Sequence, residues 1–225
     1  HDEYIYTKYS RDTLDLKYNN KISFLREHGL SEDFDNIEMP LVGMVSRLAE
    51  QKGIDLIMNK LEWYIETNQM RFVMLGSGES KYEDYFRYLA WKYPTKAFIT
   101  IGYNNALSHK IIAASDFLLM PSRFEPCGLT QLYAMKYGTI PIVRQTGGLA
   151  DTVREYNPEQ SQGTGYLFYN YNADDMAYAM RRALSIYNSE YHWNIIRRNA
   201  MAEDFSSSKT ALEYLKVFNW ALEKV

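Results

Sequence analysis

The stretch SRFEPCGLTQLYAMKYG, residues 122–138, carries side chains that could do chemistry at the start of a predicted helix. It contains one carboxylate, Glu125, and the single thiol of the chain, Cys127. Pro126 and Gly128 predict a loop with a restricted backbone conformation before this helix. Glu125 could complement the positive end of the helix dipole, an effect of roughly 0.3 to 1 kcal/mol, or it could bind hydroxyl groups of a ligand beside free helix amides. The stretch by itself leaves both roles open.

Two cations lie in a second stretch, SRLAEQKGID, residues 46–55. Arg47 follows an apolar run directly, and Lys52 precedes the turn residue Gly53. Cations beside the free amides of a helix start are typical of a phosphate pocket. The alternative is two solvated surface cations, and the spacing alone does not decide between them.

Two further junctions have weaker signals. The segment GSGES, residues 76–80, lacks the third glycine of a G-x-G-x-x-G loop, and the sequence contains no G-x-x-x-x-G-K-[ST] loop. We interpret it as a tight turn, which counts against NAD-dependent and ATP-hydrolysing enzymes. In GYNNALSH, residues 102–109, Tyr103 could stack on a planar base. With 20 tyrosines in the chain, packing is the simpler interpretation of this residue.

All these junctions fall at the ends of predicted strands. Apolar runs predict strands at residues 41–46, 71–76, 97–102, 117–121 and 140–144, and helical patterns predict helices at 54–66, 81–92, 107–114 and 129–137. This alternation favours an α/β fold with a doubly wound, Rossmann-like parallel sheet. Because ligands bind beyond the carboxyl ends of such strands, we expect both cations, Glu125, the amides of residues 128–130 and the segment TGGLAD (146–151) to meet at one edge. Polar groups of both signs gathered there suit a ligand with phosphates and hydroxyls.

The end of the chain reads as additional C-terminal helices, at 173–187, 191–202 and 208–222, and no convincing strand follows residue 170. In the last helix Leu212, Leu215, Phe218 and Leu222 recur at helical spacing. This stripe either packs on the core of the same domain or is exposed, which would favour self-association. The opening forty residues are polar and mixed. We expect a single domain over residues 1–225.

Composition limits the classes of function. The 225 residues include 46% hydrophobic residues, enough for a large core, and the net charge of −3 disfavours broad binding to nucleic acid or anionic membranes. No apolar run approaches the length that spans a bilayer. A single cysteine excludes an internal disulfide and fits a reducing compartment such as the cytoplasm. Since His1 replaces an initiating methionine, we expect a piece of a longer chain.

Metal sites have little support in the sequence. The four histidines are scattered, which indicates neither a metal cluster nor a Ser-His-Asp triad. The one D-x-D pattern, Asp33 to Asp35, lies in a polar segment before the first predicted strand. We interpret it as a solvated loop.

Several stretches together resemble one family. SRLAEQKGID, IGYNNALSH, PSRFEPCGLTQLYAMKYGTIPIVRQTGGLADTV and AMAEDFS are similar, in order and at fitting intervals, to segments of bacterial glycogen synthases and plant starch synthases. The resemblance implies a retaining glycosyltransferase of the two-domain GT-B fold, of which this chain would be the C-terminal, nucleotide-sugar-binding half, with the N-terminal acceptor domain absent. It implies transfer of glucose from ADP-glucose to the non-reducing end of an α-1,4-glucan, without a metal or other cofactor.

The resemblance also implies roles for the charged residues. Arg47 and Lys52 would contact the diphosphate, where negative charge develops as it departs. Glu125 would bind hydroxyl groups of the donor sugar. These three are the residues expected to take part in catalysis.

The remaining implied roles concern binding of the donor. Thr130 and the amides near Gly128 and Leu129 would bind phosphate and glucose oxygens. Cys127 and Gly128 would shape the sugar pocket, and Tyr103 would lie against the adenine. The glucan acceptor would be bound mainly by the absent N-terminal domain, so the chain alone is expected to be nearly inactive.

One position departs from the broader superfamily. Its Glu-x7-Glu pattern would place a second glutamate where this chain has Tyr133. Glycogen and starch synthases share that departure, which argues against a sucrose or trehalose-phosphate synthase. TGGL, residues 146–149, is only superficially similar to the K-x-G-G-L motif of the family's N-terminal half, because Gln145 precedes it. The alternative to an enzyme fragment is a non-catalytic module that binds nucleotide sugars or glucans.

Overall fold

The computed structural model describes residues 2–30, 37–67 and 69–223. Its strands are β1 (Leu41–Val45), β2 (Arg71–Gly76), β3 (Ala97–Ile101), β4 (Phe117–Met120), β5 (Ile140–Arg144) and β6 (Tyr166–Phe168). Its helices are η1 (Arg11–Leu16), α1 (Lys17–Glu27), η2 (Glu50–Lys52), α3 (Ile54–Glu66), α4 (Ser80–Lys92), α5 (Asn105–Ala114), α6 (Thr130–Lys136), α7 (Gly147–Thr152), α8 (Ala173–Tyr187), α9 (Glu190–Ala202) and α10 (Ser207–Leu222).

The strands form one sheet in the order β3-β2-β1-β4-β5-β6, and every neighbouring pair is parallel. This order confirms the doubly wound α/β fold predicted from the alternation of strands and helices. The order reverses between β1 and β4, which creates a crevice at the carboxyl ends of these two strands. The sixth strand, β6, was not predicted, because only three residues form it and glycine precedes them.

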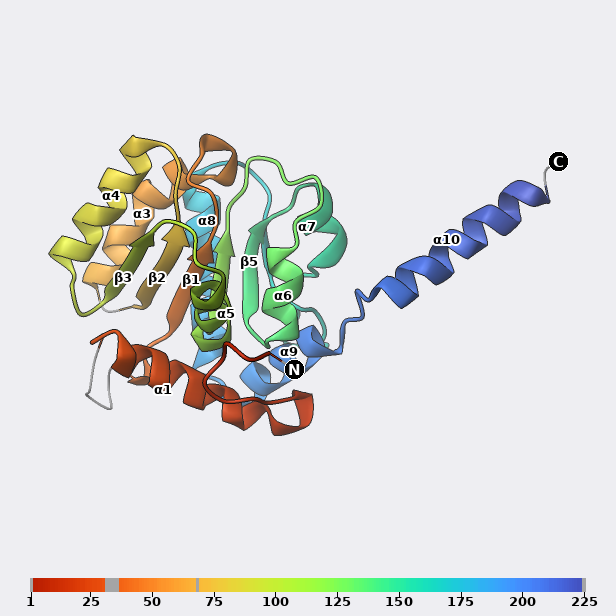
Figure 1. Ribbon diagram of the computed structural model, residues 1–225, viewed down its shortest axis with the longest axis horizontal. Helices are drawn as coiled ribbons and strands as arrows, with labels where there is room; N and C mark the ends of the chain where they lie inside the picture. Colours follow the sequence, from red (N-terminus) through yellow and green to blue (C-terminus); the bar gives the residue numbers. More distant parts are fainter. Residues whose placement is uncertain (1, 31–36, 68, 224–225) are drawn as a thin grey trace.

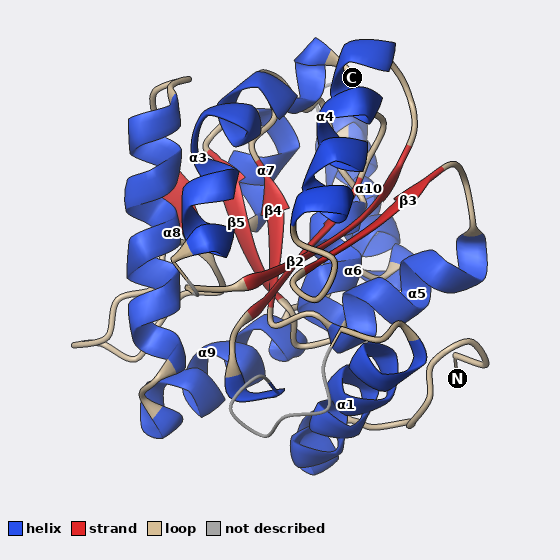
Figure 2. Cartoon of the chain, turned by 90° about the vertical axis from the view of Figure 1, so that its left-hand side faces the viewer, coloured by secondary structure: helices blue, strands red, loops and turns tan. Residues whose placement is uncertain are grey.

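Strand residues alternate between the two faces of the sheet, as a period of two requires. Along β2, Phe72 and Met74 pack in the larger core with α3, α4 and α8, whereas Val73 and Leu75 pack in a second core with α1 and α5. The ribbons show these helix layers on opposite sides of the strands (Figure 1, Figure 2). All four side chains are almost completely buried.

Helix α1 lies in the segment that we described only as polar and mixed. Three of its polar side chains, Lys17, Asn20 and Lys21, are at most 3% exposed. Since these side chains occupy positions where a helix usually carries apolar residues, the hydrophobic period is hidden in the sequence. Ser10 accepts a hydrogen bond from the Asp12 N–H and caps the start of η1, which leads into α1.

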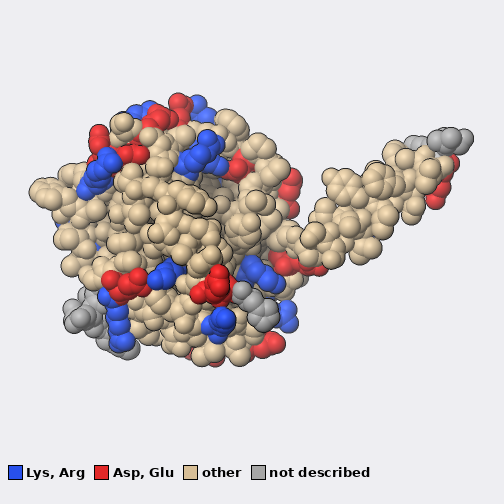
Figure 3. Space-filling view, viewed as in Figure 1, with Lys and Arg blue, Asp and Glu red and all other residues tan. Residues whose placement is uncertain are grey.

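Helix α10 has no buried residue and projects away from the rest of the chain (Figure 1). The predicted stripe of Leu212, Leu215, Phe218 and Leu222 is 55% to 74% exposed. The alternative that this stripe packs on the core of the same domain is therefore wrong. Figure 3 shows α10 with few charged side chains along most of its visible length.

Candidate functional site

The loops that follow β1 and β4 meet at the crevice where the strand order reverses. Arg47 lies two residues after β1, and Lys52 is the last residue of η2. Glu125 lies in the loop between β4 and α6. Because β1 and β4 are parallel neighbours, the loops leave the sheet at the same edge. The fold therefore places the three charged side chains predicted to act together at one edge.

A cavity of about 170 Å³ lies between these loops. Six of the predicted site residues line it: Arg47, Lys52, Glu125, Gly128, Leu129 and Thr130. The remaining lining comes mainly from the ends of β1 and β4 and includes Ser122. The expectation that cations, a carboxylate and the start of α6 share one rim agrees with this geometry.

An ion pair occupies the wall of this cavity. Lys52 Nζ lies 2.5 Å from Glu125 Oε2, and only 16% of the lysine side chain and 10% of the glutamate side chain are exposed. Ser122 Oγ donates a second hydrogen bond to the same carboxylate oxygen, at 3.2 Å. Partial burial makes the attraction stronger than it would be in bulk water. The pair holds the loop after β1 against the loop after β4.

The turn before α3 explains how Lys52 comes so close to Glu125. Gly53 has φ +71°, a conformation that favours glycine. A Cβ atom on Gly53 would lie only 2.0 Å from the backbone oxygen of Pro121, in the loop after β4. Glycine thus permits both the turn and the close approach of the two loops.

Arg144, the last residue of β5, was not predicted as part of this region. Its Nε donates to the backbone oxygen of Ser122 at 3.0 Å, and its terminal nitrogens donate to those of Arg123 and Tyr169. One guanidinium therefore ties the loop that carries Glu125 to the loop after β6. The position of an arginine at a strand's carboxyl end, next to that loop, is the signal that could have identified it.

A second arginine, Arg123, links the loop after β4 to η2 and to Tyr171. The Arg123 N–H donates to the backbone oxygen of Gln51 at 2.8 Å, and its guanidinium contacts Glu50 Oε1 at 2.6 Å. The guanidinium also lies over the ring of Tyr171, 4.8 Å from its centroid. The loops around the cavity are therefore linked by backbone and side-chain bonds.

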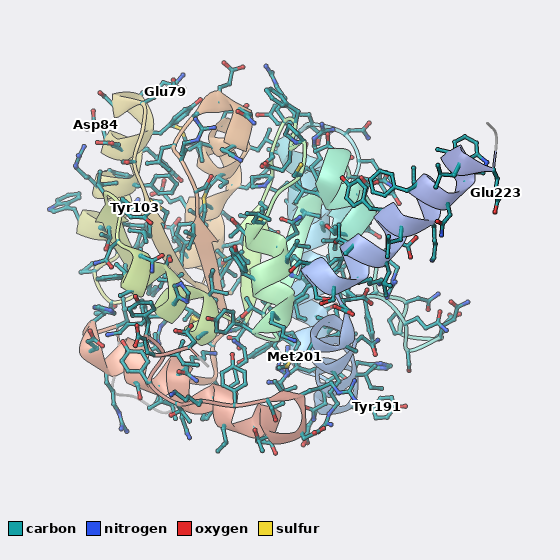
Figure 4. The ribbon with its side chains drawn as sticks, turned by 45° about the vertical axis from the view of Figure 1, so that its right-hand side comes forward. Glu79, Asp84, Tyr103, Tyr191, Met201 and Glu223 are labelled. Atoms are coloured by element: carbon teal, nitrogen blue, oxygen red, sulfur yellow. The ribbon has the colours of Figure 1, made fainter. Side chains whose placement is uncertain are left out.

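Two predicted residues lie outside the lining of the cavity. The Cys127 thiol is exposed, while the Cys127 backbone oxygen accepts a hydrogen bond from Gln131 Nε2 at 3.1 Å. Tyr103 follows β3 and is 90% exposed. Figure 4 shows Tyr103 on the same side of the molecule as Glu79, which directly precedes α4, and Asp84, which lies within this helix. The contacts predicted for Cys127 and Tyr103 therefore remain predictions.

A separate charged cluster lies at the opposite edge of the sheet, before β1 and β4. Lys21 Nζ contacts Asp116 Oδ2 at 2.6 Å, and Asp116 also accepts the Leu41 N–H at 2.9 Å. Lys17 Nζ donates to the Ala113 backbone oxygen at 2.6 Å. Burial lowers the pKa of Lys17 from its ordinary value of 10.5 to about 7, although the nearby Asp116 carboxylate opposes this shift.

Within the ranges 2–30, 37–67 and 69–223, no group of three or more His, Cys, Asp or Glu side chains could hold a metal ion. The predicted solvated loop from Asp33 to Asp35 lies outside these ranges. Among the helices described in the same ranges, none combines the length and apolar character needed to cross a bilayer.

Comparison with known proteins identifies similar chains. Residues 33–200 match the model of a family described as glycosyl transferases group 1. A glycogen synthase of Fervidobacterium nodosum is 46% identical over 224 residues, and one of Bacillus cereus strain Q1 is 45% identical over 222 residues. These matches cover 100% and 99% of this chain, but 45% and 46% of the relatives. The chain thus spans about half the length of the curated relatives it matches.

Solved structures of glycosyl transferases are similar to this chain in fold. The catalytic domain of starch synthase IV from Arabidopsis thaliana, bound to ADP and acarbose, superposes with a TM-score of 0.88 and 33% identity. The match covers 99% of this chain and 46% of the starch synthase chain. A sucrose-phosphate synthase from Thermosynechococcus elongatus has a TM-score of 0.62 at 20% identity over 94% of this chain and 51% of its own, a likeness of fold alone.

Proposed function

The chain belongs to the group 1 glycosyl transferases, and from that premise we propose that it is the donor-binding part of a glycogen or starch synthase. In this proposal the whole enzyme transfers glucose from ADP-glucose to the non-reducing end of an α-1,4-glucan, with retention of configuration. The observation that carries the proposal is the cavity at the reversal of strand order, lined by Arg47, Lys52, Glu125 and the start of α6. Its mixed charges suit a ligand that has both phosphates and hydroxyls.

The two cations are assigned to the leaving group. Cleavage of the glycosidic bond to the diphosphate leaves negative charge on the departing oxygen and positive charge on the sugar. Arg47 and Lys52 lie on the rim of the same cavity, where fixed cations stabilise that negative charge more in the transition state than in the ground state. Thr130 and the amides of Gly128 and Leu129 are assigned to phosphate and glucose oxygens.

Glu125 is assigned to the hydroxyl groups of the donor sugar. Its carboxylate is held by Lys52 and Ser122, so its orientation is already restricted before a ligand binds. A diphosphate beside Lys52 would give this lysine a second anionic partner. Cys127 and Gly128 are assigned to the shape of the sugar pocket.

The adenine is assigned to Tyr103, whose exposed ring is available for stacking on a planar base. Preference for ADP over UDP is supported by the similarity to the starch synthase that was solved with ADP. The glucan acceptor would be bound mainly by the part of the relatives that this chain does not span. We place the enzyme in the cytoplasm. Residues 1–225 are assigned to one domain. The proposed reaction uses no metal or other cofactor.

Calorimetric titration tests the donor assignment. We expect the chain to bind ADP and ADP-glucose weakly and UDP-glucose more weakly still.

The chain alone should incorporate a negligible amount of labelled glucose into glycogen, because closure of a cleft between two domains excludes water and completes such a site. Absence of nucleotide binding, or robust elongation by the 225 residues alone, would contradict the proposal.

The second candidate is a non-catalytic module that binds nucleotide sugars or glucans. It shares the cavity but needs no partner domain for its function. Adding the N-terminal half of a similar glycogen synthase in trans distinguishes the two, since only the enzyme fragment should gain elongating activity.

A further inference from the structure

Gln131, in the first turn of α6, is a completely buried polar residue behind the loop that lines the cavity. Its Nε2 donates to the backbone oxygens of Cys127 at 3.1 Å and Gly128 at 2.9 Å, and lies 3.2 Å from Thr152 Oγ1. The Thr152 hydroxyl donates its own proton to the backbone oxygen of Gly148 at 2.5 Å. All three neighbours of Nε2 therefore act as acceptors, and only the NH2 end of the amide fits there.

This arrangement fixes the direction of two peptide groups. In a planar trans peptide the C=O and the following N–H point in opposite directions. Because Gln131 draws the oxygens of Cys127 and Gly128 inward, the N–H groups of Gly128 and Leu129 face the other way. Both residues line the cavity that contains Lys52.

These two N–H groups have no acceptor within the part of the chain that the structure describes. Gly128 has φ +71°, which allows the loop to turn so that both carbonyls reach one side chain. The loop is also held by α7, since the Gly148 N–H donates to the backbone oxygen of Glu125 at 2.9 Å.

We propose that Gln131 is a positioning residue, which holds the N–H groups of Gly128 and Leu129 toward the cavity so that they can bind a phosphate oxygen of the donor. The inference rests on the proposed function and names a residue that would not itself touch the ligand. It predicts that ADP affinity depends on the NH2 group of Gln131 rather than on the volume of the side chain. Gln131→Glu keeps the shape but sets a carboxylate oxygen against two carbonyl oxygens, and Gln131→Met removes both hydrogen-bonding groups without adding charge.

The experiment uses the ¹⁵N-labelled chain, titrated with ADP and, separately, with adenosine. In the wild-type chain, ADP should shift the amide resonances of Gly128 and Leu129, and adenosine should not. Both Gln131 variants should bind ADP about tenfold more weakly, with adenosine affinity unchanged, since only the phosphate contacts are lost. In both variants, ADP should no longer shift the amide resonances of Gly128 and Leu129, even at concentrations that saturate the weaker site.

Thr139→Val is the matched control for a general loss of stability. Thr139 follows the C-terminal end of α6 and is also completely buried. Its hydroxyl donates to the backbone oxygens of Ile112 and Ser115. This variant should be less stable and should keep its ADP affinity. Equal loss of ADP affinity in Thr139→Val, or wild-type affinity in Gln131→Met, would overturn the role of Gln131.

The wild-type titration can still refute the inference if both Gln131 variants fail to fold. ADP binding without shifts at Gly128 and Leu129 would refute the inference and leave the proposed function standing. Failure of the wild-type chain to bind ADP at all would refute both.

Discussion

Lys52 Nζ lies 2.5 Å from Glu125 Oε2, although 73 positions separate the two residues in the sequence. The contact joins the loop after β1 to the loop after β4, on neighbouring strands of the sheet. Both side chains also line the cavity proposed to bind the donor, so we expect the pair to contribute to stability and to binding. Substitutions at these two positions separate the contributions.

Lys52→Met should weaken ADP binding about tenfold to a hundredfold, because a partly buried cation beside the phosphates is lost. Calorimetric titration at constant salt measures the change. Lys60→Met is the control, since Lys60 pairs with Asp174 and does not line the cavity. Unchanged ADP affinity in Lys52→Met would exclude a phosphate contact at this position.

Glu125→Gln should weaken ADP-glucose binding more than ADP binding. The substitution keeps the shape of the side chain and removes the charged acceptor for sugar hydroxyls, so the ligand without the sugar should be less affected. Titration of this variant with both ligands provides its own control. A loss of the same size for both ligands would contradict the assignment to the sugar.

The ion pair should also show energetic coupling in unfolding experiments. Lys52→Met and Glu125→Gln should each lower the free energy of unfolding by about 1 to 3 kcal/mol, because each leaves a partly buried partner without its counterpart. The double variant should lose less than the sum, with a coupling of about 0.5 to 3 kcal/mol. Urea unfolding of the four proteins measures this difference, and strict additivity would show that the contact contributes nothing.

Stability should depend on pH through Lys17. Its pKa is lowered to about 7 in the folded chain from an ordinary value of 10.5. Between these values the unfolded chain binds more protons than the folded chain, so this lysine makes the free energy of unfolding rise with pH from about 7 toward 10.5. Below pH 7 the folded chain must carry the buried positive charge of Lys17. The Asp116 carboxylate stabilises this charge, and the like charges of Arg197 and Lys21 destabilise it.

Lys17→Met removes this contribution. Urea unfolding at several pH values between 6 and 9 should give a steeper rise for the wild-type chain than for the variant. Parallel curves for the two proteins would mean that Lys17 does not titrate in this range.

The exposed stripe on α10 should promote self-association. Leu215 and Phe218 are 55% and 58% exposed, and burial of such side chains against a second copy is favourable. Light scattering and sedimentation velocity across a range of protein concentrations should reveal association. Leu215→Lys with Phe218→Lys should suppress it, whereas Lys216→Gln on the same helix should not. A wild-type chain that stays monomeric at every concentration would contradict this prediction.

The sequence determined the class of fold and identified six of the residues that line the candidate site. Short apolar runs such as Phe117–Met120 are typical of buried strands, and their alternation with helical patterns predicts a parallel sheet. Parallel strands place their carboxyl ends at one edge, which is why the sequence alone places Arg47, Lys52 and Glu125 together. The family resemblance supplied a role for each.

Tertiary structure decided the features that depend on which strands become neighbours. Strand order set β1 beside β4, and only this order brings Lys52 against Glu125. Helix α1 was hidden because Lys17 and Lys21 are buried through hydrogen bonds to distant residues. Gln131 likewise looks in the sequence like any polar helix residue. Its carbonyl partners belong to the preceding loop and its hydroxyl partner to α7, contacts that exist only once the chain has folded.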